Sequence, residues 1–166
     1  MKLDIDLQKL LGAVNVPADW VGIREVYEAH TPRMIRDGVP VANSHASTHG
    51  LMVEVLVDGQ FGYFGTPKLT QEGVSDAAKK AFLQAKLASK HSLFSFDVNA
   101  RPVFQGEYIS PYKKGRESLS AGSLNKLLLD AYNSLKISDK IVSAHSLCQI
   151  IETKSKFVSS NGSDIN

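Results

Sequence analysis

The chain has 166 residues, of which 43% are hydrophobic and 22% charged, a composition typical of one globular domain or of one domain and part of another. Its net charge of +2, from 19 basic and 17 acidic residues, gives no electrostatic case for contact with nucleic acid or an anionic membrane. The single cysteine, Cys148, excludes a disulfide framework, and no apolar run approaches the roughly 18 residues of a membrane span, so we expect a cytoplasmic protein.

The first predicted elements are one helix and two strands. Leucines at helical spacing predict a short amphipathic helix over residues 3–14. β-Branched and aromatic residues predict strands over 20–29 and 33–42. Asp37-Gly38 is a turn signal that could fold the second of these strands back on its neighbour.

A β-hairpin is the clearest local signal. Strands over 51–57 and 60–65 are joined by Asp58-Gly59, a pair that tolerates the positive φ angles of a type I′ turn. Thr70 then caps a predicted helix over 71–88, whose small and apolar residues repeat every three or four positions. We expect this helix to lie on the sheet, since its alanines allow close approach.

The second half of the chain is predicted to hold a long loop, a helix and two strands. Residues 92–118 contain two prolines and predict an irregular loop packed on the core. Strands are predicted over 140–152 and 156–160. The helix is predicted over 120–135, with its inward face formed by Leu124, Leu127, Leu128, Ala131, Tyr132 and Leu135. The predicted fold class is therefore α+β, an antiparallel or mixed β-sheet with helices packed on it.

The last residues carry a second hairpin signal, Asn161-Gly162. Only four residues follow this pair, which we judge too few for a returning strand. The expectation is that strand 156–160 lacks its partner and that the chain is the front part of a longer protein.

Two histidines four residues apart, His45 and His49, raise the question of a metal site. In a helix this spacing places two imidazoles on one face. Ser, Thr and Gly50 around them favour a loop or strand edge, and in a strand the two residues would be about 13 Å apart. We therefore interpret the pair as part of a solvated polar loop. A small metal-binding protein is the weaker alternative.

The other reactive residues have structural interpretations that we prefer. Cys148 is expected to be a small apolar core residue, because no basic residue that would activate a thiol lies near it in sequence. His91 and His145 are isolated, as is typical of surface or core histidines.

Neither the basic run nor the glycines of the hairpin predict a phosphate site. Lys113-Lys114-Gly115-Arg116 is most simply a solvated loop. Gly59, Gly62 and Gly65 lie inside a hairpin and not before a helix. We predict no catalytic, cofactor-binding or metal-binding residue in this chain.

Three stretches together resemble the opening domain of the TldD/PmbA family, zinc metallopeptidases that are also described as candidate modulators of DNA gyrase. The stretch GLMVEVLVDGQFGYFGTPKLTQEGVSDAAKKAFLQAKLAS (50–89) is similar to the family's strand pair GxxVxVLVDGxxGF and the alanine-rich helix after it. QGEYISPY (105–112) is similar to the family's GxYxxPV, and KFVSSNGSDI (156–165) to its FVSSEGxxI turn. The resemblance covers roughly Ala18 to Ile165 and leans toward the TldD side.

The resemblance implies a parent protein that degrades or matures peptides. Family members hold zinc with an HExxxH motif later in the chain and a cysteine near the far C-terminus, with the glutamate as general base. This sequence has no HExxxH, and its HASTH has the wrong spacing. We therefore expect no cofactor in this chain and zinc in the full-length parent protein.

The resemblance also implies a domain division and a role. Residues 1–138 would be the N-terminal α+β domain and 139–166 the first strands of the following region. This part would be non-catalytic, helping to form a homodimer or heterodimer with a related member around an enclosed cleft. The alternative is a freestanding protein-interaction module, for example a modulator of DNA gyrase. A coding sequence that continues past Asn166 into HExxxH would favour the peptidase.

Overall fold

A computed structural model describes residues 3–115 and 118–166. The helices are α1 (Leu7–Gly12), α2 (Gln71–Ser89) and α3 (Ala121–Leu135), with a short 3-10 turn at Val98–Ala100. The strands are β1 (Trp20–Arg36), β2 (Val39–Asn43), β3 (Ala46–Val57), β4 (Gln60–Thr66), β5 (Gln105–Gly106), β6 (His145–Ser159) and β7 (Asp164–Ile165).

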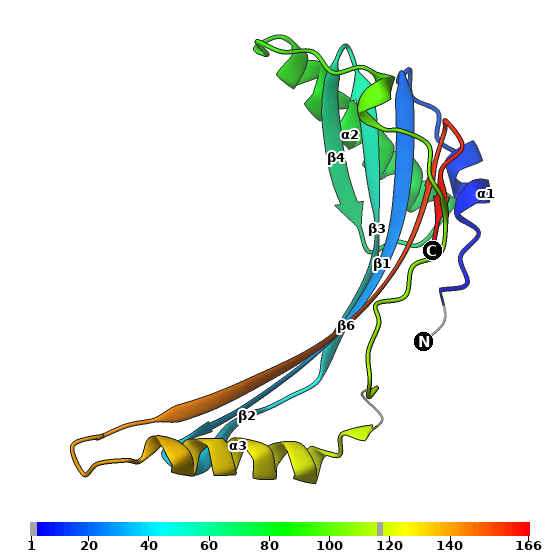
Figure 1. Cartoon of the computed structure of the whole chain (residues 1–166). Helices are drawn as coiled ribbons and strands as arrows, with labels where there is room; N and C mark the ends of the chain where they lie inside the picture. The colour runs from blue at the N-terminus through cyan, green and yellow to red at the C-terminus, as the bar shows by residue number, and fades with distance from the viewer. Residues whose placement is uncertain (1–2, 116–117) are drawn as a thin grey trace. The chain divides into compact units, whose positions relative to one another are not determined.

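The strands form one mixed sheet, with helices beside it (Figure 1). Its order is β4-β3-β1-β6-β7-β5, and β2 pairs with β1. The β3–β4, β1–β2 and β6–β7 pairs are antiparallel, whereas β5 and β7 run parallel. The predicted α+β class, with a mixed sheet and helices, is confirmed. No helix in the part of the chain that the structure describes is long and apolar enough to cross a membrane.

Two compact units divide these elements. Unit 1 comprises the residues up to Tyr27 together with Thr48–Tyr108 and Thr153–Asn166, and unit 2 comprises Glu28–Ser47 and Ile109–Glu152. Strands β1, β3 and β6 each contribute residues to both units. The predicted domain division between residues 138 and 139 stays a prediction.

Unit 1 is built around the predicted hairpin and helix, both of which are confirmed. Asp58 and Gly59 have φ angles of +49° and +74°, as the turn between β3 and β4 requires. The Thr70 hydroxyl accepts a hydrogen bond from the Gly73 amide at 3.2 Å and caps α2. Helix α1 is shorter than predicted because it begins only after Asp6, whose side chain accepts from the Lys9 amide.

The core of unit 1 lies between α2 and one face of the strands. Helix α2 contributes Val74, Ala77, Ala78, Ala81 and Ala85, and β3 contributes Leu51, Val53, Val55 and Val57. The helix backbone comes very close to the sheet at Gly62 of β4. A Cβ atom there would lie 2.0 Å from the carbonyl oxygen of Ala81. Gly62 is therefore required by packing, with no phosphate-binding role needed to explain it.

Two predicted strand breaks are wrong. Strand β1 continues through Thr31 and Pro32, and the Asp37-Gly38 turn joins it to β2 with φ angles of +50° and +81°. Strand β6 likewise runs unbroken over the polar residues 153–155 and begins at His145 instead of residue 140. In both places the residues between the predicted strands are part of one continuous strand.

The expectation that strand 156–160 lacks a partner is also wrong. Asp164 and Ile165 of β7 pair with Val158 and Phe157 of β6. The pairing is only two residues long, yet β5 pairs with β7 from its other side. Val158 is 1% exposed, so this end of β6 is covered within the chain.

Unit 2 has a smaller core, formed where α3 packs on its strands. Leu128 and Tyr132 are buried with Ile35 of β1, and Ser146 of β6 donates to the Leu128 carbonyl oxygen at 2.7 Å. The helix is confirmed and begins after the capping Ser120. Its predicted inward face is too wide, since Leu127, Ala131 and Leu135 are exposed. The long loop predicted over 92–118 is confirmed in its described residues apart from two short elements, β5 and the 3-10 turn.

We predict that Gly62→Ala destabilises the chain far more than Gly65→Ala. The added methyl at Gly62 meets the α2 backbone, an overpacking that costs on the order of 1–3 kcal/mol or more. At Gly65 the nearest atom is 3.9 Å away, so the control change stays within about 0.5 kcal/mol. Urea denaturation measures both, and equal midpoints for the two variants would contradict this account of the packing.

A second prediction concerns pH and Asp37 in unit 2. Hydrogen bonds from the Ala144 amide and the Ser143 hydroxyl lower the pKa of the Asp37 carboxyl from its ordinary value of 3.8. Because the folded pKa is depressed, the stabilisation is present above the unfolded pKa and is lost as pH falls through the folded value.

The measurement compares Asp37→Asn with the wild type in thermal melts from pH 7 down to pH 2. Asparagine tolerates the positive φ but lacks the charge, so the variant should melt lower at neutral pH. The two curves should converge below about pH 4. Asp139→Asn, an exposed change in the same unit, is the control. A gap between the Asp37 curves that stays constant down to pH 2 would refute the assignment.

Candidate functional site

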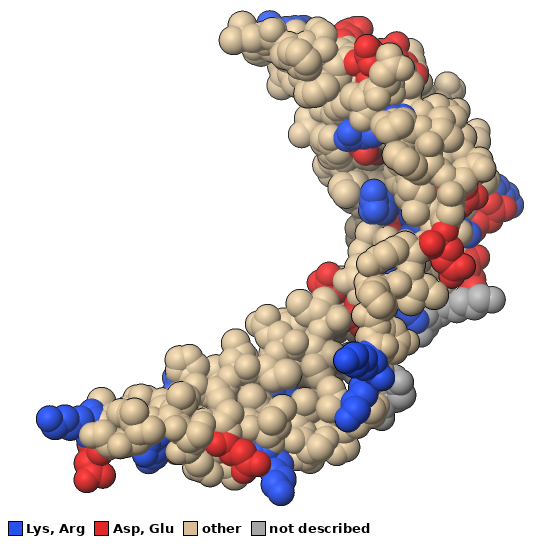
Figure 2. Space-filling model, in the orientation of Figure 1, with Lys and Arg blue, Asp and Glu red and all other residues tan. Residues whose placement is uncertain are grey.

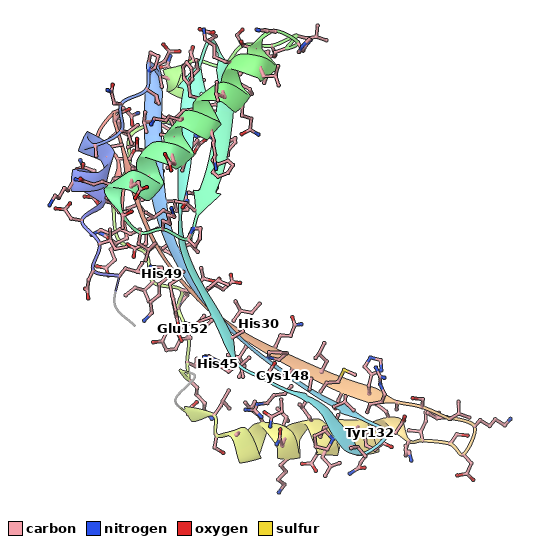
Figure 3. The ribbon with its side chains drawn as sticks, turned by 180° about the vertical axis from the view of Figure 1, so that it is seen from behind. His30, His45, His49, Tyr132, Cys148 and Glu152 are labelled. Carbon is pink, nitrogen blue, oxygen red and sulfur yellow. The ribbon has the colours of Figure 1, made fainter. Side chains whose placement is uncertain are left out.

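The two histidines that suggested a metal site, labelled in Figure 3, each have a hydrogen-bond partner of their own. His49 lies in β3, and its Nε2 is 2.8 Å from Oε1 of Glu25 on β1. His45 precedes β3, and its Nδ1 is 2.8 Å from the Thr31 hydroxyl. Interpretation as a solvated loop is wrong for His49, whose side chain is only 18% exposed. His45 is exposed, as predicted.

Glu25 is the unexpected member of this arrangement. Alternation along β1 places it on the same face as Val21 and Ile23, which belong to the unit 1 core, and it is 0% exposed. Its second oxygen, Oε2, has no hydrogen-bond partner among the described residues. A carboxylate so placed is stabilised by the imidazole that it contacts, and it loses that support if the imidazole is removed.

The His49 ring also forms part of the wall of a shallow hollow in unit 1. Tyr27 meets the ring edge to face, with centroids 6.0 Å apart at 83°. The hollow has a volume of about 320 Å³. Its wall is mostly apolar and consists of Val26, Thr48, His49, Gly50, Leu51, Met52, Gly65, Thr66 and Pro67. It could accept an apolar side chain beside an imidazole.

The remaining residues singled out in the sequence lie apart from this hollow. Cys148 packs against the core formed by Ile35, Leu128 and Tyr132, as its interpretation as a small core residue predicts (Figure 3). His91 and His145 are exposed, the first in the turn after α2 and the second at the start of β6. Lys113 and Lys114 lie in an exposed loop, and Arg116 lies outside the described residues.

Sequence reasoning missed a cluster around Arg101 in unit 1. The Arg101 side chain donates to Glu54 from Nε at 3.0 Å and to the Tyr63 hydroxyl from Nη2 at 3.1 Å. Its guanidinium carbon lies 4.2 Å from the ring centroid of Phe61. Partial burial and the negative charge of Glu54 raise the pKa of the Tyr63 phenol above 10.0. The cluster fixes one end of residues 92–104, here called the strap.

Asn161 fixes the same end of the strap from another direction. Its Oδ1 accepts hydrogen bonds from Trp20 Nε1 at 2.9 Å and from the Ser159 hydroxyl at 2.6 Å. Its Nδ2 donates to the Arg101 carbonyl oxygen at 2.8 Å. We call these contacts the Asn161 bridge. The Asn161-Gly162 turn was visible in the sequence, but nothing there indicated its partners.

Charged and metal-ligating side chains are not clustered in the described residues. Within residues 3–115 and 118–166 no three His, Cys, Asp or Glu side chains come together as metal ligands. Figure 2 shows basic and acidic side chains scattered over the visible face, without a large area of one sign.

Comparison with known protein families finds one match. Residues 21–85 match PmbA/TldA metallopeptidase domain 1. Both ends of this match, Val21 and Ala85, are buried members of the unit 1 core. The predicted resemblance to a TldD/PmbA N-terminal domain is confirmed. No curated protein matches the sequence.

Solved structures share the fold. A candidate modulator of DNA gyrase from Bacteroides thetaiotaomicron is 20% identical, with a TM-score of 0.66 over 99% of this chain and 38% of that one. A second candidate modulator, from Thermotoga maritima, is 18% identical, with a TM-score of 0.58 over 87% and 32% of the two chains. TldE from Thermococcus kodakarensis is 17% identical, with a TM-score of 0.62 over 95% and 35%. The chain thus spans about a third of the length of each.

We predict that His49→Leu destabilises the chain by about 3–5 kcal/mol, because it leaves the Glu25 carboxylate buried without its partner. The double variant Glu25→Leu/His49→Leu should recover most of this loss, since apolar residues of similar volume replace a buried pair at little cost. Urea denaturation of the two singles and the double gives the coupling energy. Additive effects would show that the two side chains do not interact.

Proposed function

We propose, from the match of residues 21–85 to PmbA/TldA metallopeptidase domain 1, that the chain is the N-terminal, non-catalytic part of a zinc metallopeptidase. The full-length protein would degrade or mature peptides in the cytoplasm. The observation that carries the proposal is the family match, whose residues 21–85 contribute most of the buried core of unit 1. The lean toward the TldD side stays a prediction.

The residues present do not fit a zinc site. A catalytic zinc needs three protein ligands and an open position for water. His49 directs its Nε2 at the buried Glu25, and His45 directs its Nδ1 at Thr31. Neither ring has a third ligand beside it in the described part of the chain. We therefore assign the zinc of the family to the rest of the parent protein and derive no catalytic step here.

The proposed role is to build walls and contact surfaces. Helix α3 leaves Leu127, Leu135 and the following Ile137 exposed by 60%, 47% and 85%. Apolar side chains gathered in this way favour a contact with another protein surface. We propose that they help to pair the parent with a second copy or with a related member, so that a peptide-binding cleft is enclosed.

A freestanding interaction module is the second candidate. Two of the structures that share the fold are described as candidate modulators of DNA gyrase, which makes a protein partner the relevant alternative to a peptide substrate. The same exposed residues of α3 would serve that function. The two functions differ in whether the full-length protein cleaves peptides in a zinc-dependent way.

We predict that the chain by itself binds no zinc tightly and cleaves no peptide. Elemental analysis after dialysis against excess zinc should show less than one zinc per chain. His45→Ala should not change that value, and neither should the exposed control His91→Ala. One zinc per chain that disappears in His45→Ala would overturn the assignment. A full-length parent without zinc-dependent peptidase activity would favour the interaction module instead.

A further inference from the structure

The Asn161-Gly162 turn between β6 and β7 has the sequence most prone to spontaneous deamidation. The reaction begins when the amide nitrogen of the following residue attacks the asparagine side chain, and a glycine does not hinder that attack. Gly162 has a φ of +99°, and no atom beyond its two chain neighbours lies within 4 Å of the position of a Cβ there.

The folded chain nevertheless holds both reacting groups. The Asn161 side chain makes the three contacts of the Asn161 bridge, to Trp20, Ser159 and Arg101. The Gly162 amide donates to the Ser159 carbonyl oxygen at 3.0 Å. These hydrogen bonds hold the side chain and the Gly162 amide in place and so oppose the reorientation that the attack needs. Reaction therefore requires a local opening of the turn.

We propose that Asn161 is a deamidation site that the Asn161 bridge keeps closed, and that deamidation loosens the strap. The Gly162 nitrogen bonds to Cγ of Asn161 and loses its proton. The Cγ–Nδ2 bond breaks, and ammonia leaves. Water then opens the resulting succinimide at either carbonyl and gives aspartate or isoaspartate. Only water is consumed, so no oxidant, enzyme or cofactor is needed.

The product no longer fits the bridge. The carboxylate lacks the Nδ2 donor and places an anionic oxygen against the carbonyl oxygen of Arg101. Isoaspartate also adds a methylene to the backbone, which shifts the two-residue pairing of β7 with β6. The strap loses this hydrogen bond at the Arg101 carbonyl. It keeps the contacts of the Arg101 side chain, of Phe96 with Gly59, and of Phe104 with Ser163 and Asp164. Deamidation is thus an ageing reaction with a defined structural result.

Protection of Asn161 by the Asn161 bridge is tested by mass spectrometry of the full chain incubated at mildly alkaline pH. Deamidation of the folded chain should be at least about tenfold slower than in urea. Trp20→Phe removes one hydrogen bond to Asn161 and should accelerate it roughly fivefold. Phe157→Leu, which removes an aromatic contact of Trp20 but no bond to Asn161, is the matched control. Equal rates in folded and unfolded chains, or equal acceleration by both variants, would overturn the proposal.

The consequence is tested on the deamidated chain, separated from the unmodified chain by ion exchange. Trp20 is the single tryptophan and is 2% exposed, so its emission reports on the bridge. Emission should shift to longer wavelength, and chymotrypsin should cut faster at Phe94 and Phe104 of the strap. Asn161→Asp, prepared separately, should behave in the same way. Unchanged emission and proteolysis of the deamidated chain would refute the release of the strap.

Discussion

One side-chain amide joins three segments of unit 1 that are far apart in sequence. Asn161 connects the turn before β7 to Trp20 at the start of β1, 141 residues away, and to Arg101 of the strap, 60 residues away. Each contact is an ordinary hydrogen bond that contributes about 1 kcal/mol. They matter because they join the start of β1, the strap and the turn between β6 and β7, which are far apart in sequence. The ends of the chain's first strand, its strap and its last hairpin are ordered together.

A steric constraint does similar work on the other face of the sheet. Gly62 lets the backbone of α2 approach β4 so closely that a methyl group would meet the Ala81 carbonyl oxygen. The alanines of the helix complete this contact, and the valines of β3 fill the space beneath it. Because neighbouring small residues set the distance between the layers, the rest of the core must match that distance. This tight layer is also the part that the family match covers.

Much of the fold could be predicted because its signals are local. The Asp58-Gly59 turn requires positive φ, and the Thr70 hydroxyl caps α2 by accepting from the amide of Gly73, three residues later. The missed features depend on distant residues. Where β1 continues past Thr31, that residue's hydroxyl contacts His45, and β7 is paired with β5 as well as with β6. The predicted buried face of α3 was too wide, because helical spacing does not show how much of the helix the strands of unit 2 cover.

The histidine pair illustrates the same limit at the site. The spacing of four residues suggested that the two histidines could bind one metal ion. The chain is extended here, so the two rings contact different residues of β1. The partner of His49 could not be predicted, since Glu25 occupies a position that the alternation of Val21 and Ile23 assigns to the core. A polar pair buried there adds less stability than an apolar pair would. Only correctly aligned strands bring carboxylate and imidazole together, so the pair favours one register of β1 on β3 over its neighbours. For a domain that we propose to be non-catalytic, fixing the register of β1 on β3 matters more than the stability that the pair adds.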